Sequence, residues 1–343
     1  MTTRTGITEQ TLAGTVDPPP YWLAMVGSTI QMGVLLWIWS DHHASAGKLF
    51  TLNDLSKDPF TASVAATLGL IFTTWIISVV DRSPHGGPNP SLVDRMWSIL
   101  PAVYCWWWYI KSEVDENTSP RLLVMTLLVT AWACRLTYNF FIKGGFSGGE
   151  DYRWKEVRSW FPGARFEIFN LVFICFFQLL LILAFTVPAV TALEHPEVPF
   201  GPIDITCMLL FLILLVGEGV ADRQMFAFQT EKYRRLKAGE TAGPIYSAGF
   251  IQSGLWAYSR HPNYFCEVHL WWAFYGFSVA ATGHVLNWSI CGAAFLTLLF
   301  VPPGGSIDVT EALSSRKYPA YAAYQKRVSC FFPWPMQLQQ KSS

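Results

Sequence analysis

The sequence predicts an all-α protein, a polytopic transmembrane helical bundle of about seven to eight spans with cytosolic loops that cover a cofactor site. Three observations favour this fold class. Of the 343 residues, 52% are hydrophobic and only 14% are charged, whereas about 25% of the residues of an average soluble domain are charged. Several apolar runs reach the length of about 20 residues that a helix needs to cross a bilayer. Lysine and arginine gather in a few of the segments between these runs.

The expected spans differ in strength along the chain. The first twenty residues are polar and lack the basic start and apolar core of a cleaved signal, so we expect the first apolar run to be a retained span. Four runs qualify on length, and a fifth follows after a Gly–His turn: residues 21–40, 60–80, 168–191, 264–283 and 284–302. Three weaker runs are shorter or carry one charge: residues 96–110, 122–142 and 203–220.

The basic residues predict the orientation. They cluster over residues 143–165, 223–260 and 316–341, whereas residues 194–204 contain no lysine or arginine. Because cytoplasmic loops of membrane proteins are enriched in these residues, we expect the three basic segments on one face and the C-terminus in the cytosol. The membrane would be the endoplasmic reticulum in a eukaryote and the inner membrane in a bacterium.

Composition also excludes several classes of protein. The 24 basic and 24 acidic residues cancel, so nothing in the charge indicates a nucleic-acid partner. The seven cysteines lack CxxC spacing, and the seven histidines do not form the HxxxH and HxxHH boxes of a membrane di-iron oxygenase. We therefore expect neither a disulfide framework nor a metal site. The sequence also lacks GxGxxG and Walker A patterns, so any nucleotide is held by loops and helix ends.

A first polar group lies at the end of an apolar run. Glu218 and Asp222 are four residues apart, so both carboxylates share one face of a helix. Ionisable groups at membrane depth are costly, which favours a functional or paired role for Glu218. Arg223, which follows, is equally well explained as an ordinary solvated helix end. Arg135 lies inside another span, and we expect it to face protein or a cavity rather than lipid.

A second polar group leads directly into a span. Pro262 suits the first turn of that helix, where free amides can meet an anion. Arg260 and His261 precede it, and the Arg260 charge suits phosphate, although a lipid-headgroup anchor also explains this residue taken alone. Asn263 offers an amide donor and an acceptor, and Glu267 lies one turn beyond it on the same face.

The tail from residue 311 to residue 333 is the third group. It interleaves tyrosines with basic side chains, among them Arg316, Tyr324 and Arg327. A helix lying along the membrane interface explains this pattern as well as contact with a ligand does.

These segments resemble the membrane steroid 5-alpha-reductase-like superfamily, and within it the DUF1295 branch. The matching motifs extend from about Asp94 to the tail: Asp94-Arg95-Met96-Trp97-Ser98, Gly149-Glu150-Asp151-Tyr152-Arg153, Ala221-Asp222-Arg223-Gln224, Gly254-Leu255-Trp256 and Ser259-Arg260-His261-Pro262-Asn263-Tyr264. The chain accordingly divides into a polar N-terminal tail (1–20), N-terminal spans (21–93), a steroid-reductase-like membrane domain (94–335) and a C-terminal tail (336–343).

The resemblance implies an NADPH-dependent reductase of an activated carbon–carbon double bond in a lipid, such as a steroid enone, a sterol or an enoyl lipid. Asp222 and Asn263 match positions that contact the cofactor in steroid 5-alpha reductases. Other candidates for the cofactor site match basic or aromatic positions or neighbour them: Arg223, Arg260, His261, Tyr264, Arg316, Tyr324 and Arg327.

The reaction also requires a donor that stabilises a developing enolate oxygen. A tyrosine would serve, as would a carboxylic acid kept protonated by apolar surroundings. The candidates are Glu218, Glu267, Tyr104 and Tyr138. The resemblance does not extend to the substrate-polarising Glu and Tyr of the steroid reductases.

Two other classes of function remain open. An Arg-His-Pro entrance with a tail of Glu, Tyr and Arg also resembles isoprenylcysteine and phospholipid methyltransferases, which use S-adenosylmethionine. The number of basic residues on the expected cytosolic face favours NADPH, which carries three phosphates. A non-catalytic lipid-binding protein with the same fold is the third class. For each class, the expected partners are an apolar lipid and the surrounding membrane lipids.

Overall fold

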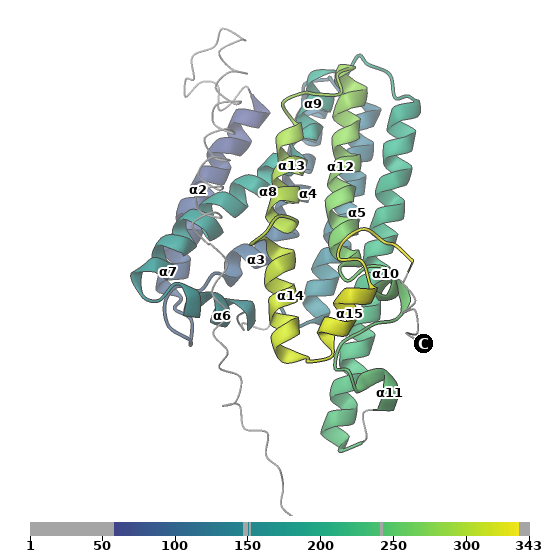
Figure 1. Ribbon diagram of the computed structural model, residues 1–343. Coiled ribbons are helices and arrows are strands. Elements are labelled where there is room, and N and C mark those ends of the chain that lie inside the picture. The colour runs from purple at the N-terminus through teal and green to yellow at the C-terminus, as the bar shows by residue number, and fades with distance from the viewer. Residues whose placement is uncertain (1–57, 147–149, 151, 241–242, 336–343) are drawn as a thin grey trace, which may run out of the picture.

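The computed structural model describes residues 58–146, 150, 152–240 and 243–335, and every regular element within these ranges is helical (Figure 1). The predicted all-α class is therefore confirmed. The expected first span at residues 21–40, both terminal tails and the motif residues Gly149 and Asp151 lie outside the described residues.

The elements follow one another in a single bundle. In chain order they are α2 (Pro59–Val80), α3 (Ser91–Trp97), α4 (Leu100–Val114), α5 (Pro120–Ile142), α6 (Tyr152–Trp160), α7 (Ala164–Phe169), the π-helix η2 (Asn170–Phe177), α8 (Gln178–Thr186), α9 (Pro188–Glu194), α10 (Pro202–Ala238), α11 (Gly243–Tyr246), the 3-10 helix η3 (Gly254–Ala257), α12 (Pro262–Thr282), α13 (Ile290–Phe300), α14 (Ser306–Lys317) and α15 (Tyr321–Arg327).

Four of the helical stretches are long and apolar enough to cross a membrane: α2, α5, the continuous stretch Ala164–Thr186 and α10. The protein is thus a membrane protein, and the apolar runs expected at residues 60–80, 122–142, 168–191 and 203–220 are confirmed as helical. The remaining runs within the described residues, 96–110, 264–283 and 284–302, contain α4, α12 and α13, and the total number of crossings stays a prediction.

Local sequence explains where these helices begin and end. Proline stands in the first turn of α2, α5, α10 and α12, where its missing N–H leaves no hydrogen bond unmade. The Asp58 carboxylate also caps α2, accepting hydrogen bonds from the backbone N–H groups of Phe60 and Thr61 at 3.2 and 3.0 Å. Helices α10 and α12 end at Gly239 and Gly283, whose φ values of 69° and 71° suit glycine.

Helix α2 packs as a membrane helix does, with small polar side chains turned inward. Ser63 accepts a hydrogen bond from the Trp108 indole at 3.0 Å, and the Thr67 hydroxyl lies 2.7 Å from the Tyr104 hydroxyl. Phe72 and Val80 on the outer face are 60% and 76% exposed. In lipid, small and hydroxylated residues favour close helix contact and hydrogen bonds between helices.

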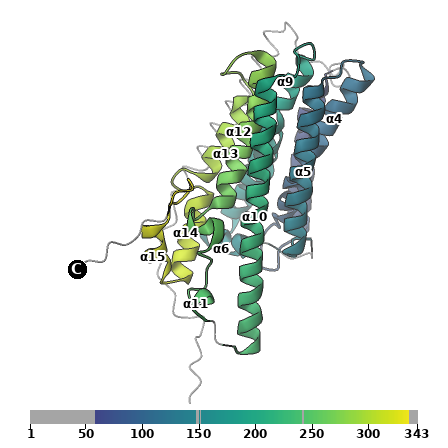
Figure 2. The ribbon, with the colours of Figure 1, turned by 90° about the vertical axis from the view of Figure 1, so that its right-hand side faces the viewer.

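Helices α10 and α12 lie side by side, and α5 runs beside them (Figures 1 and 2). A Cβ added at Gly217 of α10 would lie 3.1 Å from the Cys266 sulfur of α12, so the absence of a side chain permits this close approach. Helices α6, α11, α14 and α15 gather at the end of the bundle where α10 ends (Figure 1). The described parts of the three basic segments therefore share one end, as the sequence predicted.

Candidate functional site

One arginine gathers three carboxyls from two other helices. The Arg135 guanidinium of α5 lies 2.8 Å from Glu218 and 2.8 Å from Asp222, both on α10. Its Nη2 atom also lies 3.9 Å from Glu267 of α12. The side chains of Arg135, Glu218, Asp222 and Glu267, which we call the carboxyl cluster, are 16%, 6%, 11% and 9% exposed. The expectation that Arg135 faces protein is confirmed, as is the shared face of Glu218 and Asp222.

Helix α5 supplies further partners along the same face. Asn139, one turn after Arg135, donates a hydrogen bond from Nδ2 to Asp222 Oδ2 at 2.8 Å. Lys143, one turn further, places Nζ 3.7 Å from Asp222 Oδ1 and is 42% exposed. The spacing of four residues puts these three side chains on one stripe of the helix. Asp222 thus contacts three groups of α5, and the partly exposed Lys143 marks the side of the carboxyl cluster that is open to solvent.

Glu267 is held by two indoles. Trp132 donates from Nε1 to Glu267 Oε2 at 2.9 Å, and Trp271 donates to Oε1 at 3.0 Å. The two rings meet edge to face with centroids 5.0 Å apart, and Phe185 packs on Trp271 at 4.2 Å. The apolar ring faces close this side of the cluster to water, while the N–H groups satisfy both oxygens of Glu267.

Some polar atoms of the cluster have no hydrogen-bond partner. Arg135 Nε and Nη2 and Glu218 Oε2 are buried without one among the described residues. Nη2 is close to Glu218, but the contact lacks the alignment of a hydrogen bond, so it counts as an ion pair only. Buried groups without partners are rare and each requires an explanation.

A second polar cluster fixes the tail against the start of α12. Glu311 of α14 accepts hydrogen bonds from Arg260 Nη2 at 2.8 Å, Tyr321 at 2.7 Å and Gln325 at 2.7 Å, and it lies 2.8 Å from His261 Nε2. We call this set the Glu311 cluster. Burial alone would raise the pKa of Glu311, but the hydrogen bonds from His261, Arg260, Gln325 and Tyr321 hold that pKa well below its ordinary value.

The backbone completes this connection. Arg260 also donates from Nη1 to the carbonyls of Gln325 and Val328 at 3.0 and 2.6 Å. Its own backbone N–H donates to the Ser329 carbonyl at 2.9 Å. Tyr324, which is 2% exposed, donates to the Trp256 carbonyl at 2.5 Å. In this structure the Arg260 charge is thus neutralised by Glu311 and its donors are engaged by the tail.

The remaining candidates for cofactor binding occupy different surroundings. Asn263 Oδ1 is buried without a partner among the described residues, whereas Tyr264 stacks on His261 with ring centroids 5.3 Å apart. Arg316 reaches Glu156 of α6 at 2.6 Å. Arg327 donates to Gln252 at 3.0 Å. Arg223 is exposed.

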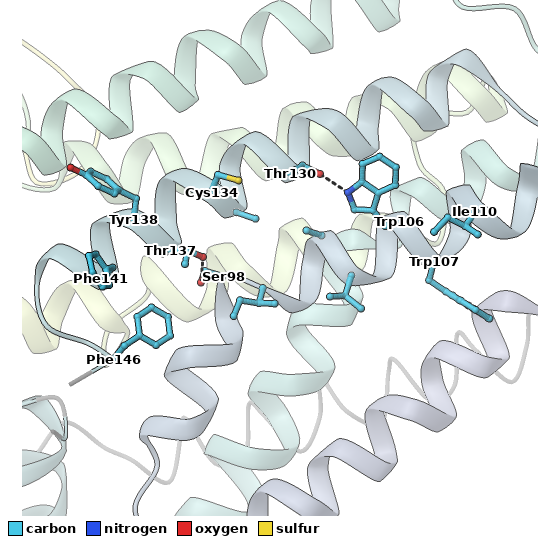
Figure 3. A pocket seen from close by; sticks show the side chains of 14 residues that line it. Ser98, Trp106, Trp107, Ile110, Thr130, Cys134, Thr137, Tyr138, Phe141 and Phe146 are labelled. Atoms are coloured by element: carbon cyan, nitrogen blue, oxygen red, sulfur yellow. Dashed lines mark hydrogen bonds between the residues drawn. The ribbon is translucent and has the colours of Figure 1, made fainter. Parts of the chain in front are cut away.

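The two tyrosine candidates lie away from the carboxyl cluster. Tyr104 is 4% exposed and faces α2 through its contact with Thr67. Tyr138 is 59% exposed and lines an open apolar groove of about 780 Å³ between α4 and α5. Figure 3 shows Tyr138, Phe141 and Phe146 at one end of this groove and Trp106 and Trp107 toward the other. The structure brings Glu218 and Glu267 together but not the two tyrosines.

Residues 261, 311 and 330 also each place a ligand atom within 4.8 Å of the others. The Arg260 guanidinium already forms an ion pair with Glu311, and a metal ion would have to displace this guanidinium. The absence of a metal site stays a prediction.

Sequence reasoning missed several members of the site. Helical spacing could have identified four of them. Trp132, Asn139 and Lys143 lie on the same helical stripe as Arg135, and Trp271 lies one turn after Glu267. Glu150 of the upstream motif is instead structural: Arg158 donates to it from Nη1 at 2.6 Å, and Ser83 donates at 2.8 Å.

Together, the fold and the carboxyl cluster define a polytopic helical membrane protein with a buried ionisable site toward one end of its bundle. The chain belongs to the family described as "Protein of unknown function (DUF1295)", whose family model matches residues 74–328. It is similar to "Uncharacterized protein C594.04c" of Schizosaccharomyces pombe, with 34% identity over 287 residues that cover 81% of this chain and 80% of the relative. No solved structure matches the chain significantly.

Proposed function

We propose that the protein is an NADPH-dependent membrane oxidoreductase that reduces an activated carbon–carbon double bond in a lipid, such as a steroid enone, a sterol or an enoyl lipid. The carboxyl cluster carries the proposal, because it buries ionisable groups and leaves polar atoms without partners. Buried polar atoms are rarely left without a partner, and clusters of buried ionisable groups are frequent at functional sites.

The unpaired atoms fit the carboxamide of a nicotinamide ring. Arg135 Nε is a buried donor without an acceptor, and Asn263 Oδ1 is a buried acceptor without a donor, in the described part of the chain. Asn263 lies one turn before Glu267, which is 3.9 Å from Arg135. A carboxamide offers one acceptor and two donors, so it can satisfy both residues.

The phosphates of the cofactor require exposed cations near this site. Arg223 follows Asp222 directly and is exposed, and Arg316 is 30% exposed with its Nε lacking a partner among the described residues. Arg260 and Arg316 are both paired with a carboxylate, but the Arg260–Glu311 side chains are 10% and 11% exposed whereas the Arg316–Glu156 side chains are 30% and 28% exposed. We therefore assign the phosphate contacts to Arg223 and Arg316, and Arg260 to holding the tail.

Bound NADPH would supply hydride to one carbon of the double bond. The chain's own residues would orient the substrate, exclude water and deliver the proton. Trp132 and Trp271 close the Glu267 side of the cluster. Cys134 lines the apolar groove and Arg135 follows it in the same helix, so the groove and the carboxyl cluster occupy adjoining faces of α5. An apolar lipid would approach through this groove.

One observation favours a second candidate function. The carboxyl cluster holds more carboxyls than the Arg135 charge balances, and excess negative charge would suit the sulfonium of S-adenosylmethionine. The protein would then be a lipid methyltransferase. A ligand comparison separates the two candidates.

The test is thermal unfolding of the purified protein in detergent with NADPH, NADH, S-adenosylmethionine or no ligand. A ligand at 100 times its dissociation constant stabilises the folded state by about 2.7 kcal/mol. We expect stabilisation by NADPH that Asn263→Ala abolishes and that the exposed control Asn117→Ala retains. Stabilisation by S-adenosylmethionine instead would establish the second candidate, and stabilisation by none would leave a lipid-binding role.

A further inference from the structure

We propose that Glu218 and Glu267 share one proton in the resting protein, that Glu218 carries it, and that this proton completes reduction of the lipid double bond. The use of the proton rests on the proposed reductase function. The shared proton itself rests only on the geometry of the carboxyl cluster.

Charge balance gives the first argument. Glu218 shares the carboxyl cluster with Arg135 from α5, Asp222 from α10 and Glu267 from α12. Lys143 of the same α5 stripe reaches Asp222. Cys266 of α12 adds a thiol beside Gly217. Three ionised carboxylates against two cations, one of them half-exposed, would leave an unmatched negative charge among buried residues. Burying an unpaired charge costs far more than binding one proton.

The hydrogen bonds give the second argument. Glu218 lies 2.8 Å from Arg135 Nη2 and Glu267 lies 3.9 Å from the same atom, so the two carboxyls flank one nitrogen. Glu218 Oε2 is buried without a partner in the part of the chain that the structure describes, and Glu218 is 5% exposed. Two carboxylates repel, whereas a carboxylic acid donates to a carboxylate. A proton on Glu218 supplies the partner that Oε2 lacks.

The surroundings of each carboxyl decide which one carries the proton. Both oxygens of Glu267 accept an indole N–H, at 2.9 and 3.0 Å, which stabilises its ionised form. Asp222 receives Arg135 Nη1 and Asn139, both at 2.8 Å. Glu218 has only the poorly aligned contact with Arg135. Protonating Glu218 therefore costs less free energy than protonating Glu267 or Asp222.

Bound NADPH would supply a hydride, which is two electrons and one proton, to one carbon of the double bond. The O–H bond of Glu218 breaks as the other carbon, or the enolate oxygen in conjugation with it, gains the proton. Glu218 is left as a carboxylate beside Arg135, and water at the exposed Lys143 edge returns the proton.

Infrared difference spectroscopy tests the shared proton without any substrate. A protonated buried carboxyl gives a C=O stretching band that ionised carboxylates lack. We expect this band in wild type minus Glu218→Gln, shifted to lower frequency in deuterated water. We expect Glu267→Gln to lose the band as well. In this variant the charges of Glu218 and Asp222 are balanced by Arg135 and Lys143, so Glu218 can ionise. Glu150→Gln, which removes a buried carboxyl paired with Arg158, is the matched control and retains the band.

A milder variant keeps the test independent of folding defects. Trp132→Phe removes one indole donor from Glu267, so the proton moves toward Glu267 and the band shifts in frequency. Absence of the band from the wild-type spectrum, or its persistence in Glu218→Gln, overturns the proposal whether or not NADPH binds. The band together with no NADPH stabilisation would leave the shared proton standing and overturn the reductase function instead.

Discussion

Glu311 shows how one carboxylate organises a tail that carries several candidate ligands. Arg260, Tyr321 and Gln325 donate hydrogen bonds to it, and His261 lies at hydrogen-bonding distance. Each of these residues precedes or follows it by at least ten positions in the chain. Removing the carboxylate would leave a guanidinium without its counter-charge, and breaking a buried ion pair costs about 3 kcal/mol or more.

The depressed pKa of Glu311 makes this contribution depend on pH. Because the pKa is lower in the folded than in the unfolded protein, the carboxylate stabilises the fold fully above its ordinary value. This stabilisation is lost as the pH falls from that value toward the depressed pKa. We expect wild type to unfold at higher temperature than Glu311→Gln at pH 7, and the difference to shrink below pH 4.5. A difference that grows with acidification would contradict this assignment.

Single residues also show what the sequence could and could not predict. The four-residue spacing of Glu218 and Asp222 predicted their shared face, and the cost of a charge in lipid predicted that Arg135 turns inward. Neither argument identifies the neighbouring helix, so the meeting of Arg135 with both carboxyls was not predicted. Arg260 was expected to suit phosphate, yet Glu311, 51 positions away, takes up its charge.

At the scale of elements, close packing of α10 and α12 is required for the carboxyl cluster. A Cβ at Gly276 of α12 would overlap the Cys207 sulfur of α10. Alanine normally stabilises a helix relative to glycine by about 0.5–1 kcal/mol, but we expect Gly276→Ala to lower the unfolding temperature. Gly69→Ala in α2 is the matched control, since no atom lies within 4 Å of its added Cβ. Equal unfolding temperatures for the two variants would argue against the close approach.

A buried ion pair holds the starts of α5 and α10 together at the other end. Arg121 lies 2.6 Å from Asp204, and both side chains are 1% exposed. We expect Arg121→Met to destabilise the fold by about 3 kcal/mol, because Asp204 is left buried and unpaired. Arg82→Met, which disrupts an exposed pair with Glu167, should change stability by less than about 1 kcal/mol. Comparable losses in the two variants, measured by thermal unfolding, would contradict the difference in burial.

The elements themselves were largely predictable, and their ends were not. Hydrophobic length located the runs that became α2, α5 and α10. The apolar run was expected to end at residue 220, but α10 continues beyond it to Ala238 and has 37 residues in all. Hydropathy decreases where α10 leaves the apolar region, but helical hydrogen bonding does not depend on hydropathy, so the polar end stays helical.

For the whole molecule, the grouping of α6, α11, α14 and α15 at one end of the bundle (Figure 1) matches the face that the basic segments predicted to be cytosolic. We expect Lys237→Cys, in the last turn of α10, to react with an impermeant thiol reagent from the cytosolic side of sealed membranes. Glu197→Cys, in the exposed loop between α9 and α10, should react only from the opposite side. Labelling of both from one side would contradict this topology.

Titration of NADPH against the wild-type protein and Asp222→Asn tests whether NADPH binds at the carboxyl cluster. Asparagine keeps the size of Asp222 but removes the charge that pairs with Arg135. Asp222 accepts a hydrogen bond from Arg135, whose Nε we assign to the carboxamide, and hydrogen bonds to charged groups contribute about 1.5–3 kcal/mol. Because the variant loosens Arg135, we expect saturable binding by wild type and affinity weakened about tenfold or more in the variant. Absence of saturable binding, or equal affinity of the two proteins, would show that NADPH does not bind at the carboxyl cluster.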